Sequence, residues 1–140
     1  MTDVITKSKR SEVMSRIKGR NTKPELAIRS LLHRMGYRFR LHRADLPGKP
    51  DIVLARYKTV IFVHGCFWHR HKDCRFAYTP KSRTEFWLKK LESNMIRDIQ
   101  VKSDLEILGW RVITAWECEL RDMKQLAVRL DVSLGGYVDE

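Results

Sequence analysis

The 140-residue sequence has no long apolar run, no internal repeat and no low-complexity tract. A membrane-spanning helix needs about 20 consecutive apolar residues, and no stretch of this chain approaches that length. The opening residues MTDVITKSKRSE have no apolar core of the kind that a secretory signal peptide carries. We therefore expect a cytoplasmic protein that does not cross a membrane.

Cysteine is scarce, with three residues in the whole chain. An odd number of cysteines cannot pair completely, and thiols stay reduced in the cytosol. A disulfide framework is therefore a poor explanation of these residues, and metal ligation is a better one.

The sequence also has no stretch with the composition of an interdomain linker, which favours a single domain. A length of 140 residues suits one domain, since domains typically have about 100–150 residues. The composition of 43% hydrophobic and 32% charged residues is sufficient for a buried core. We expect a single domain over residues 1–140.

Acidic residues are few in the first two thirds of the chain. Residues 1–50 carry 13 basic and 4 acidic side chains, residues 51–90 carry 9 and 3, and residues 91–140 carry 6 and 10. The formal net charge is +11. A basic part beside an acidic part predicts a surface that faces a polyanion such as nucleic acid. A merely soluble surface would have a similar composition, so charge alone leaves both explanations open.

The first 20 residues are basic and have little to bury. Their pattern predicts a weak helix over 6–19 with only Val13, Met14 and Ile17 as apolar positions. We expect this segment to become ordered only against a polyanion such as DNA.

The rest of the chain alternates between helical and strand patterns. Thr22 and Glu25 have the spacing of a capping box, and Pro24 is tolerated in a first helical turn. The predicted helices cover 22–36, 85–108 and 120–130, and the predicted strands cover 37–42, 51–55, 59–63 and 110–116. The residues expected to face inward on the first two helices are Leu26, Ile28, Leu31, Leu32 and Met35, then Leu88, Leu91, Met95, Ile99, Leu105 and Leu108. The order αβββαβα predicts an α/β domain with a mixed central sheet.

A first group of candidate ligands combines all three cysteines with histidine. Cys66, His71 and Cys74 are close in the chain, and Cys118 follows a predicted strand. Together they form a Cys₃His set, which is typical of a closed, structural zinc site. His69 is an alternative fourth ligand, and buried thiols without a metal are the alternative for the whole group.

A second group of candidates lies around two central strands. Asp51 begins one strand and His64 ends the next, so a hairpin would bring Asp51 to the backbone of residues 63–64. A carboxylate and a backbone carbonyl suit Mg²⁺, which can polarise a phosphodiester and stabilise the departing oxygen.

His64 and His69 could activate water, because imidazole titrates near neutral pH. Glu25 and Asp98 could orient a histidine or bind water at the metal. Taken singly, Asp51 would be a turn residue and Glu25 a capping-box partner.

Adjacent aromatic residues form a third group. Phe67-Trp68 lies in the basic, Cys/His-rich loop, and Phe86-Trp87 opens the long helix, where core packing is an alternative. Large aromatic side chains can enter a base step, unstack it and kink the duplex. The energetic cost is lowest where pairing is already weak, which favours a mismatch.

Four segments carry a resemblance to a known family. PGKPDIVL, VIFVHGCFWHRH, RTEFWLKKLESNMIRD and LGWRVITAWECEL resemble the very-short-patch-repair (Vsr) mismatch endonucleases, and the resemblance spans about residues 7–132. It implies a restriction-endonuclease-like core of the PD-(D/E)xK superfamily with αβββαβ order. It also implies Mg²⁺-dependent nicking of one DNA strand beside the T of T:G mismatches left by 5-methylcytosine deamination. Such an enzyme would act as a monomer, with a functional link to a cytosine-5 methyltransferase and repair proteins.

The resemblance further implies a role for individual residues. The catalytic residues would be Asp51, His64, His69, Glu25 and Asp98, with the Asp51 carboxylate and the Val63 carbonyl as Mg²⁺ ligands. The structural zinc ligands would be Cys66, His71, Cys74 and Cys118. The residues that intercalate beside the mismatch would be Phe67, Trp68 and Trp87.

The sequence departs from related patterns at two places. Val63-His64-Gly65 replaces the (D/E)xK of the wider superfamily, and some relatives have Thr where this chain has Val63. A backbone carbonyl can bind the metal whichever of the two side chains is present. His71 and Cys74 are one residue further apart than in some relatives, which a loop accommodates. Two alternative functions are a related Mg²⁺-dependent restriction-type nuclease and a zinc-stabilised DNA-binding module without cleavage.

Overall fold

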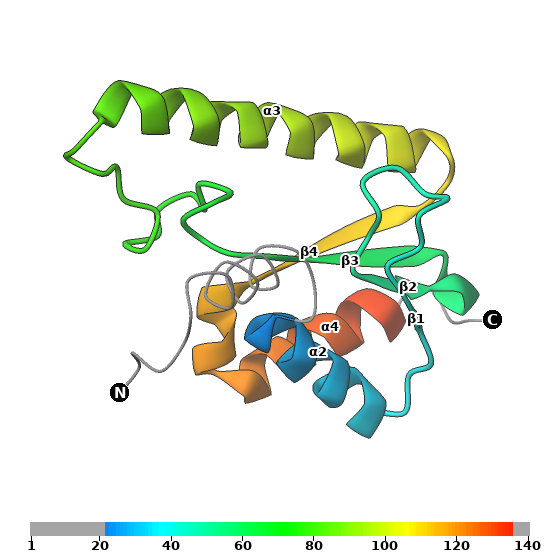
Figure 1. Ribbon diagram of the computed structural model, residues 1–140. Coiled ribbons are helices and arrows are strands. Elements are labelled where there is room, and N and C mark those ends of the chain that lie inside the picture. The colour runs from blue at the N-terminus through cyan, green and yellow to red at the C-terminus, as the bar shows by residue number, and fades with distance from the viewer. Residues whose placement is uncertain (1–21, 136–140) are drawn as a thin grey trace, which may run out of the picture.

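The computed structural model describes residues 22–135, in which a four-stranded sheet lies between two layers of helices (Figure 1). The elements are α2 (Lys23–Arg34), β1 (Arg40–Leu41), β2 (Ile52–Leu54), η2 (Ala55–Tyr57), β3 (Thr59–His64), α3 (Thr84–Ile107), β4 (Arg111–Trp116), η3 (Glu117–Arg121) and α4 (Met123–Gly135). The predicted order αβββαβα is confirmed. The basic segment 1–20 lies outside the described residues. No helix within 22–135 is long and apolar enough to cross a membrane.

The sheet is mixed, as the sequence predicted. Its strand order is β1-β2-β3-β4, with the first three strands antiparallel and β4 parallel to β3. The long helix α3 makes the crossover between the two parallel strands (Figure 1). Parallel pairing sets His64 opposite Trp116, so the segments that follow β3 and β4 leave the sheet side by side.

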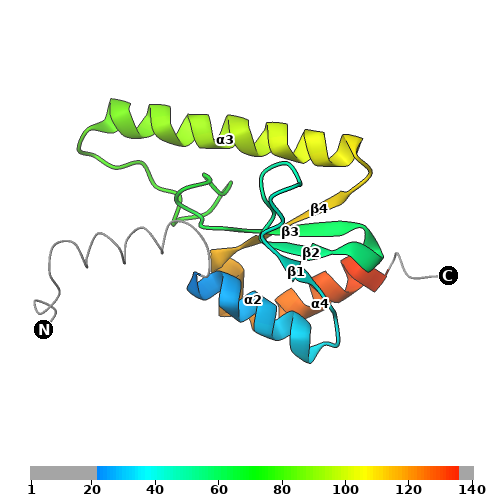
Figure 2. The same ribbon diagram turned by 45° about the vertical axis from the view of Figure 1, so that its right-hand side comes forward.

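Alternate strand residues face two separate cores. Ile52, Leu54, Ile61 and Ala115 pack with buried side chains of α2 and α4. On the other face, Val53, Val60 and Leu46 pack with Leu105 of α3 and with Trp110. Figure 2 shows the same two layers, with α3 on one side of the sheet and α2 and α4 on the other. The continuous apolar runs of β2 and β3 are explained by burial on both faces.

The turn before β2 packs closely against α3. Gly48 has a φ of +74°, and a Cβ at this position would lie 2.5 Å from Val101 Cγ1. Any larger residue would have to displace α3 or strain the turn. The close approach fixes the start of β2, where Asp51 lies.

Some predicted details of the elements are wrong. The strand expected over 37–42 is reduced to Arg40–Leu41, because β2 is short and His42 has a left-handed backbone with a φ of +47°. Leu26 is 47% exposed and not part of the apolar face. The last helix begins at Met123 rather than at residue 120 and is preceded by the 3₁₀ turn η3.

Helix α3 also differs from the prediction. Of the six residues expected to face inward, only Leu91 and Leu105 are buried, whereas Leu88, Met95, Ile99 and Leu108 are exposed. The first half of α3 extends past the sheet and lies over the loop that follows β3 (Figure 1). The N-cap position is Arg83, and the hydroxyl of Thr84 donates to the carbonyls of Pro80 and Lys81.

Candidate active site

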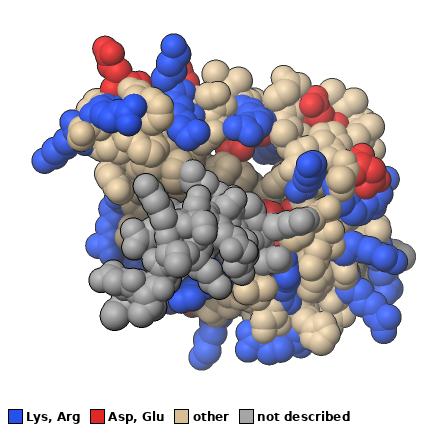
Figure 3. Space-filling view, in the orientation of Figure 1, with Lys and Arg blue, Asp and Glu red and all other residues tan. Residues whose placement is uncertain are grey.

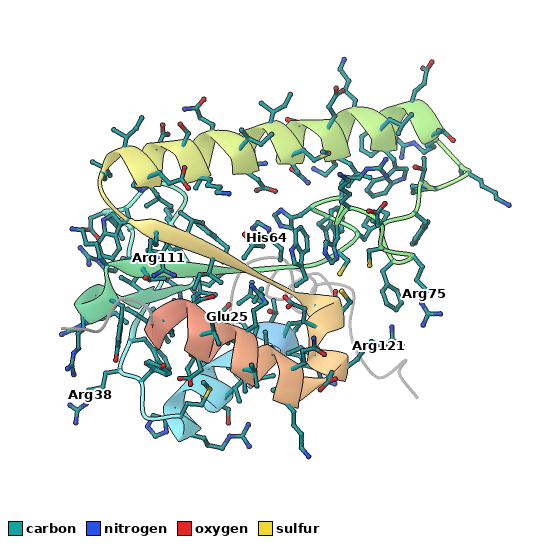
Figure 4. The ribbon with its side chains drawn as sticks, turned by 180° about the vertical axis from the view of Figure 1, so that it is seen from behind. Glu25, Arg38, His64, Arg75, Arg111 and Arg121 are labelled. Atoms are coloured by element: carbon teal, nitrogen blue, oxygen red, sulfur yellow. The ribbon has the colours of Figure 1, made fainter. Side chains whose placement is uncertain are left out.

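Glu25 is held at the start of α2 with its side chain buried. Thr22 caps the helix, since its Oγ1 accepts a hydrogen bond from the Glu25 N–H at 3.3 Å. The Glu25 side chain is 2% exposed, and its carboxylate contacts Arg29 and the Nε2 of His42, the latter at 2.6 Å from Oε2. The Glu25 carboxylate therefore faces Arg29 and His42. Figure 4 shows Glu25 in the layer of α2 and α4, and His64 between the sheet and α3.

Asp51 lies where the sequence predicted, at the same sheet end as Val63. The Val63 N–H donates to Asp51 Oδ2 at 2.8 Å, and the His42 N–H donates to the Asp51 carbonyl at 3.3 Å. The antiparallel pairing of β2 with β3 produces this arrangement, because Ile52 is opposite Ile61. The Asp51 carboxylate therefore has a fixed position, while the role of the Val63 carbonyl stays a prediction.

The electrostatics around Asp51 favour a cation. Burial raises the pKa of Asp51 to about 6, the nearby Glu25 charge raises it further, and the Val63 amide opposes the rise. The ligand atoms of Glu25, His42 and Asp51 all lie within 4.8 Å of one another. Two carboxylates in one buried site repel each other unless a proton or cation lies between them. Oxygen donors of this kind fit Mg²⁺.

Two histidines and one carboxylate form a second cluster. His69 Nδ1 lies 2.6 Å from Asp98 Oδ2, and the rings of His64 and His69 stack at 3.7 Å with an interplanar angle of 4°. Burial lowers the pKa of His64 to about 4, the His69 charge lowers it further, and Asp98 opposes. His64 is therefore neutral at physiological pH, and His69 is oriented by Asp98. Asp51 is hydrogen-bonded to Val63, the residue that precedes His64, so the two clusters lie in one site.

The three cysteines meet at one place, with His71 as their partner. The ligand atoms of Cys66, His71, Cys74 and Cys118 lie within 4.8 Å of one another, and His71 Nδ1 is 3.5 Å from Cys118 Sγ. The three cysteines are not in disulfides. This donor set fits a tetrahedral zinc ion. Cys66 and Cys118 meet because they follow the paired ends of β3 and β4 by two residues each.

His71 rather than His69 completes the thiol cluster. The His71 N–H donates to the Cys66 carbonyl at 3.0 Å, and its ring stacks on Trp116 at 4.0 Å with an angle of 8°. His69 points instead to Asp98. The residue pattern left both histidines open as the fourth ligand, and the fold places His71 with the cysteines.

The predicted aromatic residues also come together. Phe67 lies 5.2 Å from Trp68 and 5.6 Å from Trp87, measured between ring centroids, and the two tryptophans are 5.8 Å apart. Two further rings extend this aromatic cluster, Tyr78 at 5.1 Å from Phe67 and Phe86 at 5.4 Å from Trp87. Tyr78 is 61% exposed and Phe86 is 46% exposed, so the cluster reaches solvent.

Two contributors were missed by reasoning from the sequence. Tyr78 joins the aromatic cluster from the loop, and His42 joins the carboxylates. His42 is the last residue of the strand predicted over 37–42, and no local spacing connects it to Glu25 or Asp51. Basic side chains predominate over acidic ones on the face shown in Figure 3, which has α3 along its upper edge.

Comparison with known proteins gives a consistent result. Residues 2–75 match the family model described as DNA mismatch endonuclease Vsr. The type II nicking enzyme V.XorIIP of Xanthomonas oryzae pv. oryzae is 51% identical over 130 residues, which cover 93% of this chain and 95% of that protein. The type II nicking enzyme V.NmeAIP of Neisseria meningitidis is 48% identical over 131 residues, covering 94% of this chain and 93% of the relative. The DNA mismatch endonuclease Vsr of Escherichia coli is 48% identical over 126 residues, covering 90% and 80% respectively. The chain therefore belongs to the Vsr family of DNA mismatch endonucleases.

Proposed function

We propose that this protein is a Mg²⁺-dependent DNA endonuclease that nicks one strand beside the T of a T:G mismatch and thereby initiates very short patch repair. The observation that carries the proposal is the pair of carboxylates, buried Glu25 and half-buried Asp51, beside the His64–His69–Asp98 cluster. Relatives named as nicking enzymes and as a mismatch endonuclease support it. The mismatches would arise from 5-methylcytosine deamination.

The carboxylate site would hold the catalytic cation. Asp51 would bind Mg²⁺ together with the Val63 carbonyl, and Glu25 would add negative charge from α2. When bound, Mg²⁺ polarises the scissile phosphodiester and stabilises the departing oxygen. The Val63 N–H holds the Asp51 carboxylate in one orientation, so the position of the cation would be set by the sheet.

The histidines would handle the proton and the phosphate. Nδ1 of His69 contacts Asp98 at 2.6 Å, so Nε2 would be the ring nitrogen that accepts a proton. His69 would therefore take the proton of the attacking water, with Asp98 as its orienting partner. His64 is neutral because its pKa is about 4, and it would donate a hydrogen bond to the phosphate.

The thiol cluster would bind a structural zinc ion. Zinc on Cys66, His71, Cys74 and Cys118 would fix the loop after β3 to the segment after β4. The same loop carries Phe67 and Trp68 of the aromatic cluster and His69 of the active site. Zinc would therefore hold these residues in position without taking part in the reaction.

The aromatic cluster would open the duplex at the lesion. Phe67, Trp68 and Trp87 would enter the base step beside the mismatch, where the energetic cost of unstacking is lowest. The ring contacts among the three would hold them as one wedge.

The substrate would be double-stranded DNA, and no symmetric partner is needed. One mismatch is an asymmetric lesion, so a monomer suffices. The single domain over residues 1–140, with its basic segment 1–20 on the DNA, would act on chromosomal DNA in the cytoplasm. A functional link to the cytosine-5 methyltransferase that creates the lesion-prone base follows from the substrate.

A substrate panel separates the candidate functions. The purified chain is incubated with Mg²⁺ and duplexes that carry T:G, another mismatch or no mismatch, with each strand labelled separately. We expect a nick in the T strand of the T:G duplex only. Cleavage of fully paired DNA would favour a restriction-type nuclease, and binding without any nick would favour a DNA-binding module.

A further inference from the structure

His42 has a buried ring nitrogen without a hydrogen bond among residues 22–135. The side chain is 15% exposed, and its Nε2 atom is fully buried. Nε2 lies 2.6 Å from Glu25 Oε2, but the contact does not have the direction of a hydrogen bond. A buried polar atom of this kind is costly unless it has another partner.

The backbone also holds His42 in an uncommon conformation. Its φ is +47°, a left-handed value that few residues other than glycine adopt. The His42 N–H donates to the Asp51 carbonyl at 3.3 Å, so the strained residue is tied to Asp51 by the main chain. Such conformations persist where the surrounding structure enforces them, and they concentrate at functional sites.

The surroundings of Nε2 are those of a ligand. A ring nitrogen of His42 lies within 4.8 Å of a carboxylate oxygen of Glu25 and of one of Asp51, and Nε2 is the nitrogen 2.6 Å from Glu25 Oε2. Two ligand atoms in close contact without hydrogen-bond alignment are expected where both point at a common ion. A simple ion pair between His42 and Glu25 would instead align the N–H with the oxygen.

We propose that His42 Nε2 is a direct ligand of the divalent cation bound by Asp51 and Glu25, which gives a mixed nitrogen and oxygen site. This inference rests on the proposed function, because it concerns the cation of the same site. Mg²⁺ prefers oxygen ligands, whereas imidazole favours first-row transition cations. The protein therefore binds Mn²⁺ more tightly than Mg²⁺, and His42 is responsible for the difference.

The test uses the zinc-loaded full chain and Mn²⁺. Electron paramagnetic resonance counts free Mn²⁺ and gives the dissociation constant, and its pulsed form detects ¹⁴N bound directly to Mn²⁺. We expect nitrogen coupling in the wild type and its loss in His42→Gln, with the Mn²⁺ dissociation constant raised about tenfold, equivalent to about 1.4 kcal/mol. Mg²⁺ affinity, measured by competition, should change less.

Matched variants assign the nitrogen to one histidine. His33→Gln makes the same substitution in the last turn of α2, outside the site, and should retain the coupling. His64→Gln and His69→Gln should also retain it, so the assignment holds even if His42→Gln does not fold. Circular dichroism checks the fold of each variant.

Three results would overturn the inference. These are no Mn²⁺ binding, bound Mn²⁺ without nitrogen coupling in the wild type, and coupling that survives in a folded His42→Gln. Nicking of T:G duplexes with Mg²⁺ is measured in parallel. Nicking without nitrogen coupling would overturn only the role of His42, whereas nitrogen-coupled Mn²⁺ without nicking would overturn only the proposed function.

Discussion

Burial shifts the pKa of Asp51 and of His64 in opposite directions. The pKa of Asp51 rises to about 6 and that of His64 falls to about 4, because burial disfavours the charged form of either group. Both side chains are therefore largely neutral near pH 5. Above pH 6, Asp51 carries a half-buried negative charge, which is the condition that attracts a cation.

These shifts predict opposite effects of pH on stability. A folded-state pKa above the usual value of about 4 means that Asp51 destabilises the fold increasingly as the pH rises from about 4 to 6. A folded-state pKa below the usual value of about 6.5 means that His64 destabilises the fold increasingly as the pH falls from 6.5 to 4. The two effects partly cancel in the wild type.

Single substitutions separate the two effects. Relative to wild type, Asp51→Asn should gain about 2 kcal/mol of unfolding free energy as the pH rises from 4 to 6, and His64→Gln should gain a similar amount as the pH falls from 6.5 to 4. Urea unfolding without added Mg²⁺ measures both. Differences from wild type that do not vary with pH would contradict the assigned shifts.

Asp98 is expected to act through His69 rather than on the substrate. Asp98→Asn removes the charge that holds the ring at 2.6 Å, so we expect the nicking rate to fall about 100-fold with little change in DNA affinity. Single-turnover nicking and a binding titration measure the two quantities. Asp104→Asn, on the same helix and hydrogen-bonded to Gln100, is the control. An equal loss in both variants would argue against the role of Asp98.

Residue spacing predicted most of the groups that the fold brings together in the candidate site. Asp51 met Val63 as expected because two adjacent strands fix their register locally. His42 was not predicted, because its position depends on a left-handed turn and on a helix 17 residues earlier in the chain. No short-range pattern encodes such a contact.

Among the elements, α3 shows that an apolar periodicity predicts a helix but does not determine which of its apolar residues are buried. The sequence pattern marks an apolar stripe along the helix, but burial depends on what covers it. Leu105 is covered by the sheet, whereas the first half of α3 extends over the loop that follows β3 (Figure 1). A periodic pattern therefore predicted the helix correctly and its buried face only in part.

This difference has a measurable consequence for stability. Leu105→Ala should lower the free energy of unfolding by about 2–5 kcal/mol, because a fully buried side chain is removed from the core. Ile99→Ala, at a position 68% exposed, should change it by less than about 0.5 kcal/mol. Denaturant unfolding of the two variants provides the comparison. Equal costs would mean that Ile99 is also covered.

The loop after β3 should depend on zinc for its structure. We expect about one zinc per chain by elemental analysis. Removal by a chelator should loosen the loop, so that trypsin cuts faster after Arg70, Lys72 and Arg75, and it should reduce nicking, since the loop carries His69, Phe67 and Trp68. Restoration by Zn²⁺ but not by Mg²⁺ is the control. A chelated protein that keeps its protease resistance would contradict the structural role.

At the scale of the whole molecule, the sheet connects three functional regions. His64 ends β3 beside Asp51, which precedes β2, and the loop that follows β3 carries residues of the thiol cluster and of the aromatic cluster. The restriction-endonuclease-like core expected from the family agrees with the mixed sheet and the element order. The basic charge of residues 1–90 lies in the part of the chain that holds most of these groups, which fits binding to a polyanion.

We expect the nicking of T:G duplexes to depend on the Asp51 carboxylate, and one measurement tests this most directly. The rate of nicking in the T strand is compared for wild type, Asp51→Asn and Asp45→Asn, the last at an exposed carboxylate paired with Arg43. We expect Asp51→Asn to reduce the rate by about 1,000-fold or more, equivalent to about 4 kcal/mol of transition-state stabilisation, while Asp45→Asn nicks as wild type. An Asp51→Asn protein that is folded, binds the duplex and nicks it at the wild-type rate would contradict the account.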